Sequence, residues 1–308
     1  MDKKPLVSVG IPTYNRPDGL RRTLASIVGQ SYGNLEIIVA DNASTDSGVY
    51  DVVQEFRCLD NRIQYFRHRE NKGALYNFQF VLAQASGEYF MWAADDDWFD
   101  EKYIEDCQNG FARGADYSIV GGQARYVDDG GKVVLESQPL NLEDDSPIKR
   151  LIAYYRHISR GYGNAIFYGL MLKSDICKAH LINEFAGDSA TIAEMSFLGK
   201  VRTLRSVHIY YRLGGSSKSI KKMVAAMQLP KWNEWLPGIA SACVFVKSLW
   251  VSEVYRLGML KKTYLSWRLF CIAATMYEIQ KAKGEYLRLA SAVRRTGSSL
   301  KKMLLGRV

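Results

Sequence analysis

Short apolar runs alternate with helically spaced apolar positions through the first hundred residues. Four runs have the length and composition of buried strands, at 6–11, 35–40, 63–66 and 88–94. Between them, apolar side chains recur three or four positions apart, as at Leu20, Leu24 and Ile27, and these segments predict helices. Strands that alternate with helices at this pace predict an α/β fold with a doubly wound, mainly parallel sheet.

The pattern changes after residue 116. Strands are predicted at 117–121, 123–127, 132–135, 165–172 and 201–211, and helices at 148–158 and 187–198. From residue 219 onward only helical spacing is found, interrupted at Pro230 and Pro237. We therefore expect an α/β domain over 1–218, with halves at about 1–115 and 116–218, and a helical C-terminal region over 219–308.

The positive charge of the chain belongs to the helical region. The 308 residues hold 41 Lys+Arg and 32 Asp+Glu, a net charge of +9, whereas residues 220–308 alone hold 16 and 4, a net charge of +12. Helices that combine Lys and Arg with Trp and Tyr suit an anionic membrane surface. The alternative is a cap that packs on the α/β domain or forms a homo-oligomer. No nucleic-acid-binding motif accompanies the charge, so a nucleic-acid partner is not expected.

The lack of a recognisable targeting segment and the pattern of cysteines predict a cytoplasmic protein. The apolar run at 6–11 is too short for the core of a signal peptide, and those at 235–246 and 269–277 are too short to span a membrane. The five cysteines are odd in number, far apart and without C-x-x-C spacing, which predicts buried thiols in a reducing compartment. We expect a cytoplasmic protein with peripheral contact at the inner face of the cell membrane.

Polar residues follow three predicted strands, at 12–16, 41–44 and 95–97. Because ligands bind at the carboxyl ends of parallel strands, these segments form one candidate site. Asp95, Asp96 and Asp97 directly follow a buried strand, and three adjacent carboxylates repel one another unless a proton or cation relieves them. Mg²⁺ or Mn²⁺ suits such a group and can bridge to a substrate diphosphate. Capping of a following helix would explain one aspartate but not three.

Four motifs in sequence order resemble the family 2 glycosyltransferases of the GT-A fold. They are VGIPTYNR at 9–16, IVADNASTD at 38–46, NKG at 71–73 and ADDD at 94–97. The match runs from residue 6 to about 105, and residues 187–188 and 210–217 are similar to weaker signatures of the same family. The resemblance implies a GT-A catalytic domain over 1–218, with a nucleotide-sugar half and an acceptor half. It also implies sugar transfer from a nucleotide diphosphate donor, usually with inversion, and Mn²⁺ or Mg²⁺ at the aspartate motif.

The resemblance also implies where the donor binds. The loop at 12–16 matches the segment that holds the nucleotide, and Asp41 matches the acid that binds a pyrimidine base, as in UDP or dTDP. A glycine-containing loop after residue 212 either closes over the diphosphate or is a basic surface turn. The expected donor residues are Pro12, Thr13, Tyr14, Arg16, Asp41, Asn42, Lys72, Asp95, Asp96, Arg212 and Ser216.

Catalytic and metal-binding roles complete the prediction. Asp188 matches the carboxylate that deprotonates the acceptor hydroxyl, with Glu184 and Glu194 as alternatives, although Asp188 is also a plausible helix cap. The metal ligands are expected to be Asp97 and Asp95, with His208 as a further ligand by similarity to some GT-A enzymes.

The sequence therefore predicts a bacterial glycosyltransferase that builds a surface polysaccharide or glycolipid on a glycan or lipid-linked acceptor. Two alternatives remain at this point. A nucleotide-sugar pyrophosphorylase would share the fold and metal acids, but it normally carries a glycine-rich basic loop after the first strand, and 12–16 is not one. A non-catalytic membrane-associated scaffold would not need the aspartate triplet.

Overall fold

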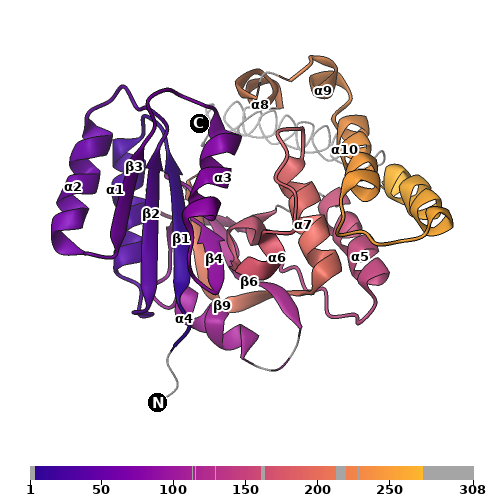
Figure 1. The fold of residues 1–308 in the computed structure, drawn as a ribbon, viewed down its shortest axis with the longest axis horizontal. Helices are drawn as coiled ribbons and strands as arrows, with labels where there is room; N and C mark the ends of the chain where they lie inside the picture. Colours follow the sequence, from indigo (N-terminus) through magenta and orange to yellow (C-terminus); the bar gives the residue numbers. More distant parts are fainter. Residues whose placement is uncertain are drawn as a thin grey trace, which may run out of the picture.

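The computed structural model describes residues 4–112, 114, 116–128, 130–160, 164–212, 220–227 and 229–272. A mixed sheet lies at its centre, with helices packed on both faces (Figure 1). The first half contains β1 (Val7–Thr13), α1 (Pro17–Val28), β2 (Leu35–Asp41), α2 (Gly48–Leu59), β3 (Ile63–Arg67), α3 (Ala74–Gln84), β4 (Tyr89–Trp92), β5 (Trp98–Phe99) and α4 (Tyr103–Phe111). The second half contains β6 (Tyr117–Val127), β7 (Val133–Glu136), α5 (Pro147–Ser159), η1 (Ala165–Tyr168), β8 (Leu170–Leu172), α6 (Lys173–Ile176), α7 (Gly187–Leu198) and β9 (Lys200–Arg212).

The sheet has the order β3-β2-β1-β4-β8-β6-β9-β5, with β7 paired to β6. Strands β3, β2, β1 and β4 are mutually parallel, and the long β6 and β9 are also parallel. The short β8, β5 and β7 join in antiparallel pairs. The predicted α/β fold with a doubly wound, mainly parallel sheet is confirmed.

Alternate residues of β2 enter two separate cores. Ile37 and Val39 pack with α1 and α2 on one face, while Ile38 and Ala40 pack toward α3, α5 and α7 on the other. Because both faces are covered, the strand reads as a continuous apolar run rather than as an alternating one. This is why the sequence pattern located the first four strands well.

The C-terminal helices pack on the α/β domain. After β9 come α8 (Ile220–Ala226), α9 (Trp232–Trp235), α10 (Pro237–Val251) and a helical segment at 259–272. Phe245 of α10 lies 4.3 Å from Tyr155 of α5 between ring centroids, and Tyr255 lies 5.0 Å from Phe197 of α7. No helix of the described residues is long and apolar enough to cross a membrane. The boundary at residue 218 stays a prediction, and residues 273–308 of the basic region lie outside the described residues.

Three expectations about local structure need correction. The strand predicted at 165–172 is the 3-10 helix η1 followed by the short β8, because Phe167 turns inward and stacks on Trp92 at 4.9 Å. The two strands predicted at 117–127 are one strand with a register shift at Gly122. Only Cys107 is a buried thiol. The other four cysteines are exposed, at Cys58, Cys177, Cys243 and Cys271.

Candidate active site

Three strand ends bring the predicted donor residues of segments 12–16, 41–42 and 95–96 together at one edge of the sheet. Thr13 ends β1 and pairs in register with Asp41, which ends β2. On the other side of β1 lies the parallel β4, and the N–H of Ala93 donates to the carbonyl oxygen of Gly10 at 2.9 Å. The loops that follow these parallel strands therefore lie side by side, as predicted.

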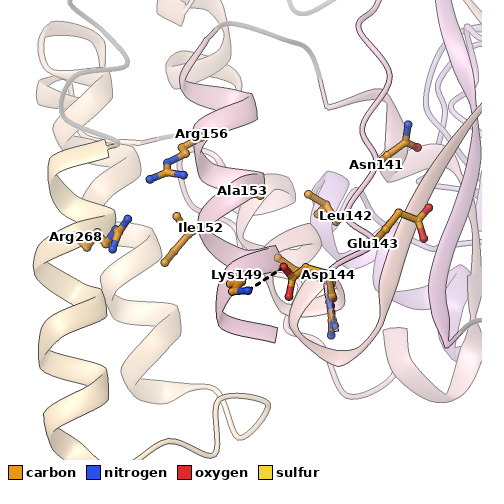
Figure 2. Close-up of a pocket in the computed structure, with 10 residues that line it drawn as sticks. Asn141, Leu142, Glu143, Asp144, Lys149, Ile152, Ala153, Arg156 and Arg268 are labelled. Carbon is orange, nitrogen blue, oxygen red and sulfur yellow. Dashed lines mark hydrogen bonds and ion pairs between the residues drawn. The ribbon is translucent and has the colours of Figure 1, made fainter. Parts of the chain in front are cut away.

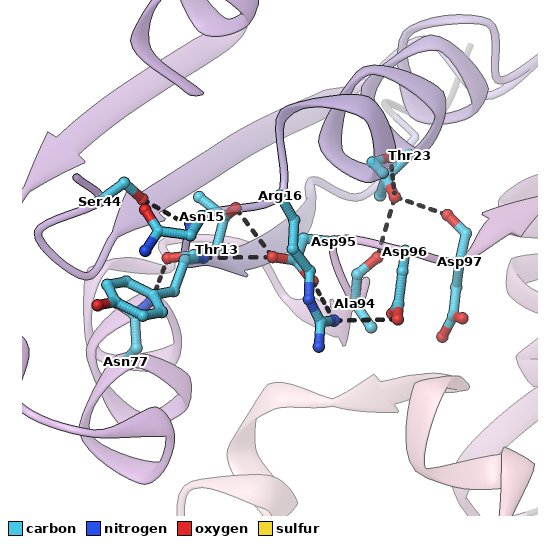
Figure 3. A network of polar contacts seen from close by, with 12 residues as sticks. Thr13, Asn15, Arg16, Thr23, Ser44, Asn77, Ala94, Asp95, Asp96 and Asp97 are labelled. Atoms are coloured by element: carbon cyan, nitrogen blue, oxygen red, sulfur yellow. Dashed lines mark hydrogen bonds and ion pairs between the residues drawn. The ribbon is translucent and has the colours of Figure 1, made fainter. Parts of the chain in front are cut away.

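Asp95 is anchored by the loop that follows β1 (Figure 3). Its Oδ2 accepts hydrogen bonds from the Thr13 hydroxyl at 2.9 Å and from the Tyr14 N–H at 3.3 Å. Nη1 of Arg16 lies 3.1 Å from Oδ1 of Asp95 and 3.0 Å from Oδ2 of Asp96. Burial raises the pKa of Asp95, although the positive charge of Arg16 opposes this shift. The carboxylate of Asp95 is thus already occupied by protein donors.

Asp97 differs from Asp95 in this respect. The residue is 5 % exposed, yet among the described residues no donor binds its carboxylate. Burial, followed by the negative charges of Asp96 and Asp95, raises the pKa of Asp97 well above its usual range. A buried carboxylate among like charges and without a donor is a group that a divalent cation would stabilise.

A metal at this position would need ligands from the substrate. Among the described residues, no three His, Cys, Asp or Glu side chains form a complete metal centre. Mg²⁺ usually takes one or two carboxylates from a protein and fills its other positions with water and substrate phosphates. Asp97, with Asp96 beside it, fits such a partial site. Asp95, the second ligand predicted from the sequence, is held by Thr13, Tyr14 and Arg16 instead.

Helix α1 fixes the backbone of the aspartate loop. The Thr23 hydroxyl lies 2.7 Å from the carbonyl oxygen of Asp97 and 3.0 Å from that of Ala94. Gly19 approaches so closely that a Cβ there would lie 2.3 Å from the carbonyl oxygen of Asp95. Neither residue was singled out from the sequence, because these contacts join positions more than 70 residues apart.

The loop after β1 is also tied to the loop after β2. Asn15 has a positive φ of 54°, which asparagine tolerates better than most residues. Its Oδ1 accepts from the N–H groups of Thr45 and Asp46 at 2.8 and 3.1 Å, and its own N–H donates to Ser44 at 3.0 Å. Within the first loop, Pro12 is buried in β1, whereas Tyr14 is 40 % exposed at the edge of the site.

Asp41 is buried and already bound. Its Oδ1 accepts from the Ser44 N–H at 2.8 Å, and its Oδ2 accepts from the Tyr65 hydroxyl at 2.9 Å and lies 3.5 Å from Nε of Arg67. Burial, followed by the hydrogen bond to Asp41, raises the pKa of the Tyr65 phenol, so Tyr65 remains a donor at neutral pH. The predicted contact of Asp41 with a base stays a prediction.

Asn42 connects β2 to the segment that carries Lys72. Its Nδ2 donates to Asn71 Oδ1 at 2.9 Å and to the Gly73 carbonyl at 3.1 Å, and its Oδ1 accepts from the Lys72 N–H at 3.0 Å. The Lys72 ammonium lies 4.8 Å from the ring centroid of Tyr76 and is exposed. Asn42 is therefore an organiser of this loop, while Lys72 presents a positive charge at its rim.

Asp188 lies in the first turn of α7 and is exposed. Asn164 Nδ2 donates to its Oδ2 at 3.1 Å, and the Tyr154 hydroxyl donates to Asn164 Oδ1 at 3.0 Å. Asn164 is a site residue that sequence reasoning missed, since nothing in its local sequence marks it. These two successive hydrogen bonds orient Oδ2 of Asp188, whereas no described donor binds its Oδ1.

Glu194 and Glu184, the two alternatives to Asp188, are bound by other protein groups. Glu194 is fully buried, and its carboxylate accepts from the N–H of His180 at 2.8 Å and from the Ser248 hydroxyl at 2.6 Å. Glu184 forms an ion pair with Lys247 of α10. Both acids join the α7 region to the C-terminal helices, and the role of Asp188 as the base stays a prediction.

Tyr168 lies close to both the aspartate triplet and Asp188. Burial, followed by the negative charges of Asp97 and Asp188, raises the pKa of its phenol well above the ordinary value. Its ring centroid is 6.2 Å from that of Tyr211, which is 5.3 Å from Tyr126. This tyrosine cluster was not predicted, and the charges of both groups of acids act on its Tyr168.

The three remaining predicted residues are His208, Arg212 and Ser216. His208 Nδ1 lies 2.8 Å from Asp100 Oδ2, and the His208 N–H donates to the same oxygen, so Asp100 rather than the aspartate triplet holds this imidazole. Its role as a metal ligand stays a prediction without support from this geometry. Arg212 is exposed at the end of β9, and Ser216 lies outside the described residues.

The structure also holds a cavity of about 410 Å³ (Figure 2). It is bounded by α5, the 141–144 loop and the helical segment at 259–272. Lys149 pairs with Asp144 at 3.3 Å on one wall, while Arg156 and Arg268 face the cavity from two different helices. None of the predicted donor, metal or catalytic residues lines it.

The known proteins to which this chain is similar are glycosyltransferases. The family model described as glycosyl transferase family 2 matches residues 8–176. The chain is similar to TuaG of Bacillus subtilis, a glycosyltransferase named for teichuronic acid biosynthesis, with 34 % identity over 119 residues. That alignment covers 38 % of this chain and 47 % of TuaG, so the chain spans about half the length of that relative.

Two further comparisons cover more of the chain. The GalNAc(5)-diNAcBac-PP-undecaprenol beta-1,3-glucosyltransferase of Campylobacter jejuni is 28 % identical over 239 residues, 74 % of each chain. The crystal structure of S. aureus TarS 1-349 in complex with UDP-GlcNAc matches with a TM-score of 0.56 and 17 % identity over 83 % of this chain and 69 % of that one. At this identity the structural similarity shows only that the two proteins share a fold.

Proposed function

The chain belongs to glycosyl transferase family 2, and from that premise we propose that it is a metal-dependent enzyme that moves a sugar from a UDP or dTDP donor to an acceptor hydroxyl. The observation that carries the metal-dependent part is the buried carboxylate of Asp97, which no described protein donor binds. Family membership supports the glycosyl transfer itself, and the intact acidic site argues against a degenerate scaffold. A pyrophosphorylase would share these acids, and it is family membership that argues against this alternative.

The donor would bind across the three loops at the carboxyl ends of β1, β2 and β4. Tyr14 is exposed there for contact with the nucleotide, and Lys72 places a positive charge at the rim. Arg16 lies beside Asp95 and Asp96, where a diphosphate would meet its guanidinium. Asp41 supports the base-binding wall by holding Tyr65 and Ser44.

Asp97, with Asp96 beside it, would hold Mn²⁺ or Mg²⁺. When bound, such a cation neutralises the negative charge that develops on the departing nucleoside diphosphate. The protein would contribute the fixed carboxylates, since Thr23 and Gly19 hold the backbone of the loop in place. We expect metal and nucleotide to bind together, because so few protein ligands are available.

Asp188 would act as the base of an inverting, single displacement. The acceptor oxygen bonds to the anomeric carbon as the bond from that carbon to the diphosphate oxygen breaks, and the acceptor proton passes to a carboxylate oxygen of Asp188. Asn164 holds the other oxygen at 3.1 Å and so keeps the carboxylate in one orientation. The Tyr168 phenol, whose pKa is raised by burial and by the charges of Asp97 and Asp188, remains protonated.

The acceptor would be a growing surface glycan or a lipid-linked glycan. The undecaprenol-linked substrate in the name of the C. jejuni relative favours a lipid-linked acceptor. An enzyme with such an acceptor would work at the cytoplasmic face of the membrane, with peripheral contact to it. Assembly into a homo-oligomer stays a prediction.

A thermal-shift screen of nucleotide sugars with Mn²⁺ tests this proposal. A true donor raises the unfolding temperature by mass action, and reaction with an acceptor lipid extract then reports transfer. We expect Asp188→Asn to keep the donor-induced shift but to lose transfer, whereas Asp51→Asn on α2 keeps both. Equal transfer by Asp188→Asn and wild type would contradict the assignment of the base.

A further inference from the structure

The helical segment at 259–272 has two apolar faces, although a surface helix ordinarily has one. Leu265 and Leu269 are each 1 % exposed and pack into the main core, which fixes the orientation of the helix. On the opposite side, Leu260 is 88 % exposed and Trp267 is 67 % exposed. We call the exposed set the outward aromatic face: Met259, Leu260, Tyr264, Trp267 and Phe270.

The outward aromatic face is a property of the helix rather than a set of scattered residues. Leu260, Tyr264 and Trp267 are spaced four and three residues apart, so they lie on one side of the helix. Trp250 at the end of α10 extends the apolar surface, because its Nε1 donates to the Ser266 hydroxyl at 2.8 Å and its ring is partly exposed. Figure 1 shows this helix beside α10 at the edge of the molecule, away from the parallel strands. A contiguous exposed patch of this kind marks a contact surface.

Basic groups flank this face. Between residues 236 and 272, five Lys and Arg residues accompany a single acid, Glu253. The Lys262 ammonium lies 5.9 Å from the ring centroid of Trp250, and Arg268 donates to the Tyr264 hydroxyl at 2.6 Å. The aromatic rings are therefore bordered by cations, as in segments that lie at the boundary between lipid headgroups and acyl chains.

Positively charged side chains also border the cavity beside this helix. Arg268 borders it together with Arg156 of α5, and among the described residues no carboxylate pairs with either guanidinium (Figure 2). Two arginines without acidic partners at one opening favour an anion such as a phosphate group.

From these observations we propose that the outward aromatic face is a docking surface for an anionic lipid membrane. Exposed Trp, Tyr, Leu and Met side chains would enter the headgroup region, and the flanking cations would meet lipid phosphates. The charge complementarity favours this partner over a second copy of the chain, since two copies would bring like charges together. The proposal specifies the membrane contact of the proposed function, but membrane binding is measured without substrate, so either can fail alone.

Co-sedimentation with vesicles tests the docking surface. The 308-residue chain is mixed with vesicles of phosphatidylcholine alone or of equal parts phosphatidylcholine and phosphatidylglycerol, at low and high salt. We expect binding to the anionic vesicles that weakens with salt. The double variant Leu260→Ser/Trp267→Ser should lose roughly tenfold or more in partitioning, because two large side chains no longer enter the lipid. A second variant, Lys261→Gln/Lys262→Gln, should weaken binding to the anionic vesicles alone.

Leu59→Ser is the matched control, because Leu59 on α2 is 75 % exposed and lies on a different helix. It should bind vesicles as wild type does, and thermal unfolding should show that all variants fold. Equal binding to neutral and anionic vesicles, or unchanged binding by Leu260→Ser/Trp267→Ser, overturns the proposal. It is equally overturned if wild type does not bind vesicles and the face variant instead dissociates an oligomer in light scattering.

Discussion

Arg16 and Asp95 join the loop after β1 to the loop after β4 through a contact of 3.1 Å between Nη1 and Oδ1. The same guanidinium nitrogen reaches Asp96 at 3.0 Å. One cation therefore compensates the first two carboxylates of the triplet, whereas no donor from the described part of the chain binds the carboxylate of Asp97. The division of the triplet into two compensated acids and one uncompensated acid underlies the account of the site.

Replacing Arg16 by methionine should disturb this balance. The aliphatic length is kept while the positive charge is lost, so Asp95 and Asp96 repel each other and Asp97. Because Arg16 is partly exposed to solvent, we expect a loss of only about 1 kcal/mol in the free energy of unfolding. Binding of UDP should weaken about tenfold. Urea unfolding and calorimetric titration measure the two effects, and Arg16→Lys should fall between methionine and wild type. Unchanged stability and UDP affinity in Arg16→Met would contradict this role.

The hydrogen bond from Asn164 to Asp188 predicts a change in the pH dependence of transfer. Asn164→Ala should lower kcat about tenfold with little change in the KM for the donor, because the base is no longer oriented. Asn164→Asp places a second negative charge beside Asp188 and should raise the pKa of the base. The acidic limb of the pH–rate profile should then move to higher pH. A profile that keeps its position in Asn164→Asp would show that Asn164 does not act through Asp188.

The close approach of Gly19 to the aspartate loop predicts that a substitution at Gly19 changes both stability and donor binding. In Gly19→Ala the new methyl group would lie 2.3 Å from the carbonyl oxygen of Asp95, and backbone must move to accommodate it. We expect a loss of about 1–3 kcal/mol in stability together with weaker donor binding. Gly33→Ala is the control, since a Cβ at Gly33 meets nothing within 4 Å. Equal stability of the two variants would argue against the close approach of α1 to the aspartate loop.

His157 predicts how stability depends on pH. Burial, followed by the positive charge of Arg160, lowers the pKa of this imidazole from 6.5 to about 4. The folded state therefore holds His157 neutral, and its contribution is fully present above pH 6.5 and is lost as pH falls toward 4. We expect the unfolding free energy of wild type to fall by about 1–3 kcal/mol more than that of His157→Gln over this interval. If the unfolding free energies of wild type and His157→Gln change equally with pH, the prediction is wrong.

The sequence predicted best those features that a short segment determines by itself. Apolar runs buried on both faces, such as β1 and β2, were located within a few residues, and the aspartate triplet was recognised from its place after β4. Contacts between distant segments were not predictable. Asn164 meets Asp188 only because η1 and α7 come together, and the two-residue β5 exists only because β9 pairs with it.

Residue identity also could not reveal which acid is compensated. Asp95 and Asp97 belong to one run of aspartates in the sequence, and the contacts of Thr13, Tyr14 and Arg16 with Asp95 distinguish them. His208 shows the same limit, since its place on β9 suggested a metal ligand while the fold sets it against Asp100.

Calorimetric titration of Mn²⁺ in the presence of UDP tests the central claim, that Asp97 binds a divalent cation together with the donor diphosphate. Wild type should bind Mn²⁺ much more tightly with UDP than without it, because the nucleotide supplies the missing ligands. Asp97→Asn should lose this coupled binding, while Asp51→Asn should retain it. If Asp97→Asn binds Mn²⁺ and UDP as wild type does, the cation does not bind at Asp97 and the proposed site is wrong.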